Sequence, residues 1–125
     1  RGVLDADKRI AAWASRIAVP AVSNNFSGRN MTMMATDEDK PSAAEIEGLA
    51  EIPYATAAFR AIHVPVGQPA PLGYWRSVGH SFSAFIVESF VDELAAAAGA
   101  DPLAFRLGLL KDRPRHAAVL RAAAS

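Results

Sequence analysis

Alternating apolar and polar residues at the start of the chain predict a β-hairpin over residues 1–22. A short apolar-containing run, Arg1–Leu4, leads into Asp5–Lys8, whose polar residues are typical of a turn. The apolar positions that follow are irregular enough that a helix over residues 9–18 is the second interpretation. The aspartate-rich turn and Pro20 favour the strand.

The next stretch, residues 23–50, changes to Ser, Asn, Asp, Glu and Gly and predicts a long loop. Loops of this length inside a compact domain are uncommon and often line a functional surface. Three methionines, Met31, Met33 and Met34, raise the question of a copper site. Without His or Cys at ligand spacing, they are more typical of loop anchors or core filler.

Residues 52–66 predict a strand, and Pro65 indicates that it is an edge strand or ends there. The sequence "GQPAPLG" at residues 67–73 then forms a cluster of turn residues. The β-forming side chains of the strand are Phe59, Ile62, Val64 and Val66.

The C-terminal third predicts three helices, over residues 81–98, 102–111 and 114–124. The first is expected to begin at a Ser81 or Ser83 cap and to end at Gly99. One face of this helix carries Ile86, Val87, Phe90, Val91, Leu94 and Ala98. Phe82 and Phe85 fall on its other side, which predicts that its first turns are buried on two sides.

The second and third predicted helices have their own start signals. Asp101 followed by Pro102 is a strong N-cap and first-turn pair, and Asp112-Arg113-Pro114 opens the third helix. Leu103, Leu107 and Leu110 form the apolar stripe expected for the second.

These elements predict an α+β fold with two to three N-terminal strands, a long loop and three consecutive C-terminal helices. The 125 residues are expected to form a single partial domain, divided into a hairpin, a loop, a strand with a site-type loop, and a helical segment. The boundaries of these four segments are 1–22, 23–50, 51–80 and 81–124. Because the chain begins with Arg1 rather than Met, we expect a piece of a longer polypeptide.

Composition excludes several functional classes. Lys and Arg total 13, as do Asp and Glu, so the net charge is zero and nothing favours nucleic acid or a membrane surface as a partner. No apolar run is long enough to span a bilayer. The absence of cysteine excludes thiol chemistry and says little about the compartment.

The titratable residues show no metal or triad pattern. His63, His80 and His116 are scattered, so no zinc site is predicted, and His63 and His116 are expected on the surface of a strand and a helix. Glu88 and Asp92 are four residues apart on one helix and could act as a carboxylate pair. A solvated helix face is the favoured interpretation of that pair.

The decapeptide "GYWRSVGHSF" at residues 73–82 is the strongest candidate site. It places two aromatic residues and Arg76 just before the start of a helix, where free N–H groups and the helix dipole favour an electron-rich ligand. The alternative is structural, with Trp75 in the core and Arg76 paired with Glu88 or Asp92. The residues alone favour these two interpretations equally.

The stretch "PLGYWRSVGHSFSAFIVESFVDELAAAAGADPLAFRLGLL" resembles the molybdopterin-binding catalytic subunit of the xanthine dehydrogenase family. It is most similar to the branch of the isoquinoline 1-oxidoreductase beta subunits, which includes aldehyde oxidoreductase-like relatives. "GVLDADKRIAAWASRIAVP", "EGLAEIPYATAAFRAIHVPV" and "PRHAAVLRAAA" resemble the same subunit in the same order. The resemblance covers nearly the whole chain but only a small part of such a subunit.

The resemblance implies that a loop of five residues contacts the molybdenum cofactor. Those residues are Trp75, Arg76, Ser77, Val78 and Gly79. The wider family often has Arg-Gly-Phe-Gly here, so Ser77 and Val78 depart from it and stacking of a substrate on Val78 is not implied. No catalytic base and no metal ligand are expected in this chain, and Glu88 is expected to be structural.

The resemblance also implies partners. The full subunit would hold a molybdopterin-type molybdenum cofactor and hydroxylate aldehydes or N-heterocycles, with iron–sulfur clusters on a partner subunit. The chain by itself is expected to be inactive, to bind no cofactor tightly and to self-associate through surfaces that the remainder of the subunit would cover. The alternative function is a non-catalytic structural or interaction module without a cofactor.

Overall fold

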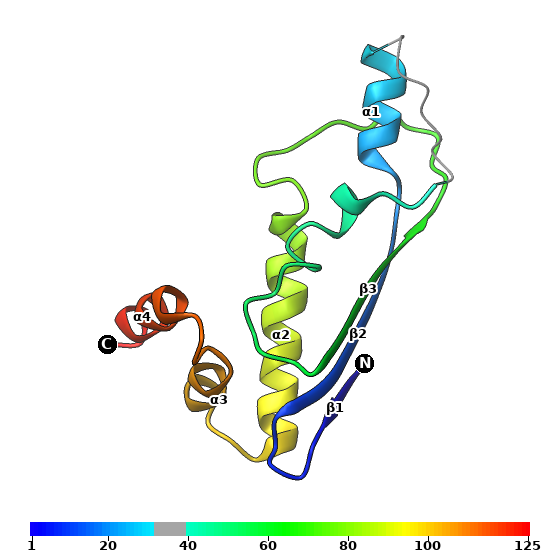
Figure 1. Cartoon of the computed structure of the whole chain (residues 1–125). Coiled ribbons are helices and arrows are strands. Elements are labelled where there is room, and N and C mark those ends of the chain that lie inside the picture. Colours follow the sequence, from blue (N-terminus) through cyan, green and yellow to red (C-terminus); the bar gives the residue numbers. More distant parts are fainter. Residues whose placement is uncertain (32–39) are drawn as a thin grey trace. The chain divides into compact units, whose positions relative to one another are not determined.

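The chain has an α+β fold, as the sequence predicts, in a computed structural model that describes residues 1–31 and 40–125 (Figure 1). A three-stranded sheet and a short helix come first, and three helices end the chain. The elements are β1 (Gly2–Leu4), β2 (Ile10–Val19), α1 (Val22–Asn30), the 3₁₀ turn η1 (Ala43–Ile46), β3 (Ala58–Pro65), α2 (His80–Ala98), α3 (Pro102–Leu109) and α4 (Pro114–Ala123).

The predicted N-terminal hairpin is confirmed. β1 pairs antiparallel with β2, with Gly2 opposite Trp13 and an irregular register after Val3. The connecting turn is closed by the N–H of Lys8, which donates to the carbonyl of Asp5 at 3.1 Å. Lys8 adopts a φ of 62°, a left-handed conformation that suits a tight turn. The alternative helix over residues 9–18 is wrong.

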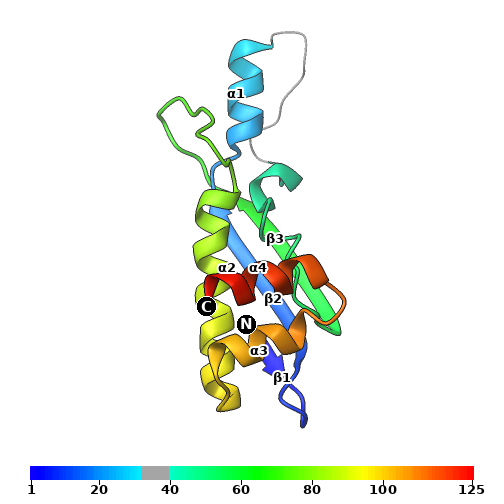
Figure 2. The ribbon, with the colours of Figure 1, turned by 90° about the vertical axis from the view of Figure 1, so that its left-hand side faces the viewer.

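β3 completes a mixed sheet in the order β1-β2-β3 (Figures 1 and 2). Its flanking residues pair in parallel with β2, since Ala57 donates to the carbonyl of Ile10 and Val66 to that of Val19. The strand begins at Ala58, six residues later than residue 52, where the sequence places it. Pro53 has no N–H to donate to a neighbouring strand, so residues 52–57, before β3, form bends and irregular chain instead.

Two compact units make up the chain, and each has its own packing. The first unit comprises Arg1–Ala14, Glu51–Arg60 and Phe85–Ser125, and the second comprises Ser15–Ala50 and Ala61–Ala84.

The core of the first unit centres on Trp13, which is 1% exposed. Its indole meets the ring of Phe90 edge to face, with centroids 4.7 Å apart and planes at 87°. Val91 and Leu94 of α2 are also buried, as the predicted stripe requires. Ile86, predicted to share that stripe, is instead 40% exposed because it lies at the edge of the buried face.

The predicted signals at the end of α2 and at the starts of α3 and α4 are confirmed, although α3 ends at Leu109 rather than at Lys111. α2 ends at Gly99, whose φ of 68° is accessible to glycine without strain. Asp101 caps α3, since its Oδ1 accepts the N–H of Ala104 at 2.8 Å. Pro114 occupies the first turn of α4.

α1 and η1 in the second unit correct the prediction of a continuous loop over residues 23–50. No residue of α1 is buried, so its sequence has no apolar stripe that could have indicated a helix. Its start is instead held by Glu45, which is 6% exposed and whose Oε1 accepts the N–H and the hydroxyl of Ser23 at 3.0 and 2.9 Å. Met33 and Met34 lie outside the described residues.

His63 corrects a second expectation, because it is buried at 3% exposure rather than lying on the strand surface. Its Nδ1 accepts the N–H of Ser42 at 2.9 Å, and its Nε2 lies 2.9 Å from the carbonyl of Val19. Nδ1 accepts a hydrogen bond and Nε2 donates one to the carbonyl, an arrangement that only the neutral imidazole can make. His63 therefore links β3 to β2 and to the segment before η1.

None of the helices within residues 1–31 and 40–125 has the length and apolar character needed to cross a membrane.

Candidate functional site

The chain at the start of the candidate loop, residues 73–79, is held in place by contacts with α1. The N–H of Leu72 donates to Oδ1 of Asn25 at 2.9 Å, and the guanidinium of Arg29 donates to the carbonyl of Leu72. The ring of Tyr74 packs against Phe26, with centroids 5.1 Å apart. Three contacts with a single helix therefore position the chain just before the tip of the loop.

The tip of the loop is a tight turn with an unusual backbone. Ser77 has a φ of 72° and Val78 a φ of 44°. A left-handed conformation costs a β-branched residue such as valine on the order of 1–2 kcal/mol, and such strain is often found at functional sites. The N–H of Val78 donates to the carbonyl of Trp75 at 3.1 Å, and the hydroxyl of Ser81 donates to that of Arg76 at 3.1 Å, so the turn is held at both ends.

Gly79 joins the turn to α2 at a point of close backbone approach. It is buried, and a Cβ at this position would lie 3.0 Å from the carbonyl oxygen of Glu47. Gly48 has a φ of 76°, and its own Cβ would lie 3.0 Å from the ring of His80. Nδ1 of His80 is 3.6 Å from Oε2 of Glu47. The two glycines therefore let the start of α2 pack directly on the chain after η1.

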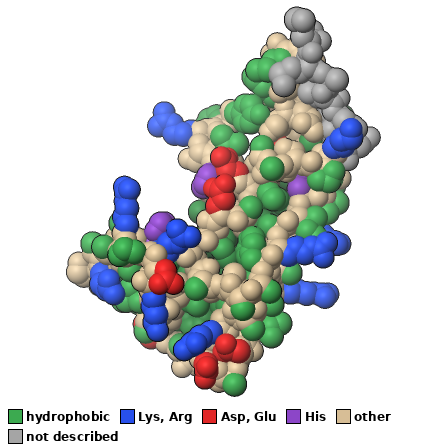
Figure 3. Space-filling model, in the orientation of Figure 1, with side chains coloured by type: hydrophobic (Ala, Val, Ile, Leu, Met, Phe, Trp, Pro, Cys, Tyr) green, Lys and Arg blue, Asp and Glu red, His purple; other side chains and the backbone are tan. Residues whose placement is uncertain are grey.

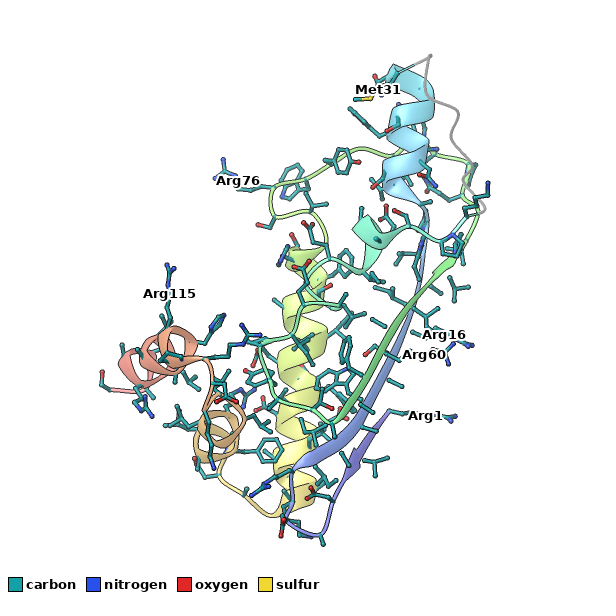
Figure 4. The ribbon with its side chains drawn as sticks, in the orientation of Figure 1. Arg1, Arg16, Met31, Arg60, Arg76 and Arg115 are labelled. Carbon is teal, nitrogen blue, oxygen red and sulfur yellow. The ribbon has the colours of Figure 1, made fainter. Side chains whose placement is uncertain are left out.

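The side chains at the tip point outward. Trp75 is 85% exposed, and Arg76 points away from the rest of its unit (Figure 4). Trp75 therefore does not lie in a core within this chain. Arg76 forms no ion pair with any described residue, and Glu88 and Asp92, its partners in the structural alternative, bind Arg106.

The start of α2 corrects two further expectations. Ser81 and Ser83 both lie inside the helix and neither caps it; the Oγ of Ser83 is fully buried and finds no hydrogen-bond partner among the described residues. Phe82 and Phe85 are 38% and 76% exposed, so the first turns are not buried on two sides within this chain. Both rings therefore contribute apolar surface to the outside of the chain.

A charged network that the sequence did not indicate lies in the first unit. The side chain of Arg106 donates to Glu88 at 2.9 Å, to Asp92 at 2.6 Å, and to the carbonyls of Pro102 and Glu88 at 3.2 and 3.0 Å. The hydroxyl of Tyr54 lies 2.9 Å from Oε2 of Glu88. Burial opposes the positive charge of Arg106 and lowers its pKa. The hydrogen bonds that Asp92 and Glu88 accept from Arg106 outweigh this effect, so the pKa of Arg106 is raised overall.

Arg106 belongs to a face of α3 that differs from the predicted one. Phe105, Arg106 and Leu109 are the buried residues of this helix. Of the expected stripe, Leu110 is buried directly after the helix, whereas Leu103 and Leu107 are only half-buried. The guanidinium of Arg106 can be buried on this face because Glu88 and Asp92 of α2 accept its hydrogen bonds. An acidic pair at i and i+4 before an arginine-bearing helix is the signal that could have indicated this network.

The pKa of Tyr54 gives a testable pH dependence. Burial, followed by the charge and hydrogen bond of Glu88, raises this pKa from 10.0 to about 12. The folded chain therefore favours the protonated phenol, whose contribution to stability is complete below pH 10 and is lost as the pH rises towards 12. We expect Tyr54→Phe to remove this alkaline loss, which urea unfolding of both proteins across that pH range would measure. Identical pH profiles would contradict the assignment.

The loop offers groups for an oxygen-rich ligand but none for a metal. Within the described part of the chain, no three His, Cys, Asp or Glu side chains gather as a metal site. The guanidinium of Arg76, the indole of Trp75 and the backbone at the start of α2 can donate hydrogen bonds or form a flat wall. These residues fit contact with an anionic organic cofactor whose metal is held by other ligands.

Sequence comparison finds similarity to a nicotinate dehydrogenase. The relative is one of the subunits of that enzyme in Pseudomonas putida (strain KT2440), and it is 31% identical over 126 aligned residues that cover 98% of this chain. The alignment covers 10% of the relative, so the chain spans about a tenth of its length. No protein-family model matches, and no solved structure matches. The chain is thus a distant homologue of a short part of a dehydrogenase subunit.

Proposed function

We propose that this chain is a segment of a molybdopterin-binding oxidoreductase subunit and that Trp75–Gly79 forms one wall of the cofactor site. The observation that carries the proposal is the exposed pair Trp75 and Arg76 on a strained turn whose base is fixed to α1. A large indole with 85% of its surface exposed is unusual unless something else covers it. The similarity to a dehydrogenase subunit over 98% of the chain supports a cofactor and the remainder of such a subunit as that covering.

In this proposal each residue of the loop has a physical role. Arg76 supplies a fixed positive charge and a planar donor fork towards the anionic cofactor or its bound substrate. Trp75 provides a flat apolar surface that excludes water from one side. Ser77 and Val78 contribute exposed backbone that can approach a ligand closely, and the buried Gly79 fixes that turn against the chain after η1. The cofactor, when bound, supplies the redox chemistry of hydroxylation at an electron-poor carbon.

The substrate class and partners follow from the same proposal. The named substrate of the relative, nicotinate, is a nitrogen heterocycle, which favours N-heterocycles over aldehydes. The remainder of the subunit would cover Phe82 and Phe85, and an iron–sulfur subunit would accept the electrons. The catalytic base would come from outside this chain, because Glu88 is engaged by Tyr54 and Arg106.

The test is Arg76→Ala in the intact enzyme. Removing a charge-assisted contact to the cofactor or substrate is expected to lower kcat/KM by about 10- to 100-fold. Folding should be unaffected because Arg76 pairs with no described side chain and points outward. Steady-state kinetics, molybdenum content and the thermal midpoint would be measured together.

Arg60→Ala is the matched control, since it removes an exposed arginine on β3 that lies outside the loop. We expect it to leave kinetics, metal content and thermal midpoint unchanged. If Arg76→Ala matched the control in both kinetics and molybdenum content, the cofactor role of the loop would be wrong.

A further inference from the structure

A groove in the first unit lies beside α4 and has a volume of about 580 Å³. Its lining comes from the chain before β3, from α2, from the end of α3 and from α4. The lining residues are Pro53, Tyr54, Glu88, Leu110, Arg115, His116, Val119, Leu120 and Ala123. We propose that this groove binds a small organic carboxylate with an apolar body. The proposal does not rest on the cofactor assignment of residues 75–79.

The walls of the groove are mainly apolar. Pro53, Leu110, Leu120 and Ala123 present hydrocarbon surface to its interior. Val119 is 65% exposed, so its side chain remains open to a ligand rather than being covered by the chain itself. Burial of an apolar body against these residues would favour binding.

Among the described lining residues, Glu88 is the one carboxylate, and its hydrogen bonds are taken up by its neighbours. Glu88 accepts hydrogen bonds from Nε of Arg106 at 2.9 Å and from the hydroxyl of Tyr54 at 2.9 Å. The Tyr54 proton is committed to that bond, so the ring adds apolar surface rather than a free donor. Arg106 is shared with Asp92, so this side of the groove keeps one net negative charge and favours the apolar body of a ligand over its carboxylate.

Two of the lining residues that α4 contributes are basic. Arg115 and His116 lie in the first turn of α4, where the helix dipole also favours a negative charge. The sequence of α4 contains no Asp or Glu, and neither side chain forms a hydrogen bond or ion pair with residues 1–31 or 40–125. Figures 3 and 4 show basic and hydrophobic side chains together over this helix, with Arg115 projecting from it.

Size and charge together define the ligand class. Pockets for small molecules usually measure roughly 300–1,000 Å³, so this groove can hold a hydrocarbon or aromatic body of about eight carbons. A carboxylate is the group that an arginine fork binds in two places. An amphipathic monocarboxylate satisfies both the apolar walls and Arg115, whereas an amine of the same length satisfies only the walls.

Isothermal titration of the 125-residue chain with octanoate and with octylammonium tests the proposal. We expect octanoate to bind at least about tenfold more tightly, a difference of about 1.4 kcal/mol. Equal affinities would reveal an unselective apolar surface and overturn the proposal. The absence of octanoate binding at concentrations of about 5 mM would also overturn it. A dissociation constant weaker than millimolar corresponds to a binding free energy of less than about 4 kcal/mol in magnitude.

Two variants locate the site. Arg115→Ala is expected to weaken octanoate binding about tenfold, while Arg121→Ala, which removes the same charge from α4 outside the groove lining, should not change it. Val119→Asp should abolish binding without unfolding the chain, because this position is largely exposed. Equal losses in Arg115→Ala and Arg121→Ala would mean that octanoate responds only to net charge, and the proposed site would then be wrong.

Discussion

Replacing Trp13 by alanine is expected to lower the free energy of unfolding by about 4 kcal/mol, because the change empties a large part of a packed core. Trp13 is 1% exposed and meets Phe90 edge to face at 4.7 Å, so the surrounding side chains cannot easily fill the space. Urea unfolding followed by circular dichroism would measure the loss.

The chain carries its own control, since it has two tryptophans and the second is 85% exposed. Trp75→Ala removes the same atoms from a surface position and is expected to change the free energy of unfolding by less than about 0.5 kcal/mol. A loss in Trp75→Ala as large as that in Trp13→Ala would mean that the exposed loop packs in solution.

Arg106→Ala is expected to lower the free energy of unfolding by about 3 kcal/mol, at the lower end of the range for breaking a buried ion pair. The side chain of Arg106 is 10% exposed, but those of Glu88 and Asp92 are 47% and 58% exposed. Water can therefore rehydrate the two carboxylates after the arginine is removed, which limits the loss. Chemical denaturation at neutral pH and low salt would measure it.

Two further variants sharpen this result. Arg106→Lys should recover only part of the stability, because an ammonium group lacks the planar fork that reaches Glu88, Asp92 and backbone carbonyls together. Arg113→Ala removes an exposed arginine that makes no side-chain cap bond and should be nearly neutral. Full recovery by lysine would show that only the net charge at this position matters.

The sequence was a good guide wherever a local signal decided the structure. The turn residues Asp5–Lys8 predicted the hairpin, and Asp101-Pro102 predicted the start of α3, because each acts on backbone within a few residues. Gly99 ended α2 for the same kind of reason.

The sequence failed where a residue depended on partners far along the chain. His63 has no distinguishing neighbours in sequence, yet Ser42 and Val19 bury it by bonding both ring nitrogens. Arg106 is buried because carboxylates on α2 bind it, so the buried face of α3 includes an arginine beside Phe105 and Leu109. Helical periodicity assumes that apolar residues decide burial, so it does not detect either case.

For the candidate loop, the sequence predicted the position but not the exposure. An arginine and a tryptophan before a helix start are equally compatible with a core and with a site, and the fold rules out the core by leaving Trp75 uncovered. The left-handed backbone at Ser77 and Val78 could not be predicted either, because neither residue type favours it.

The cap that Glu45 provides to α1 has a consequence for the order of folding. α1 has no buried residue and its N-cap residue, Ala21, makes no side-chain hydrogen bond, so the helix has little stability of its own. Glu45 is separated from Ser23 by 22 residues, and closing a loop of that length costs chain entropy before the cap can form. α1 should therefore form late, after the sheet has brought residues 42–46 alongside, and a peptide containing only this helix would remain a coil.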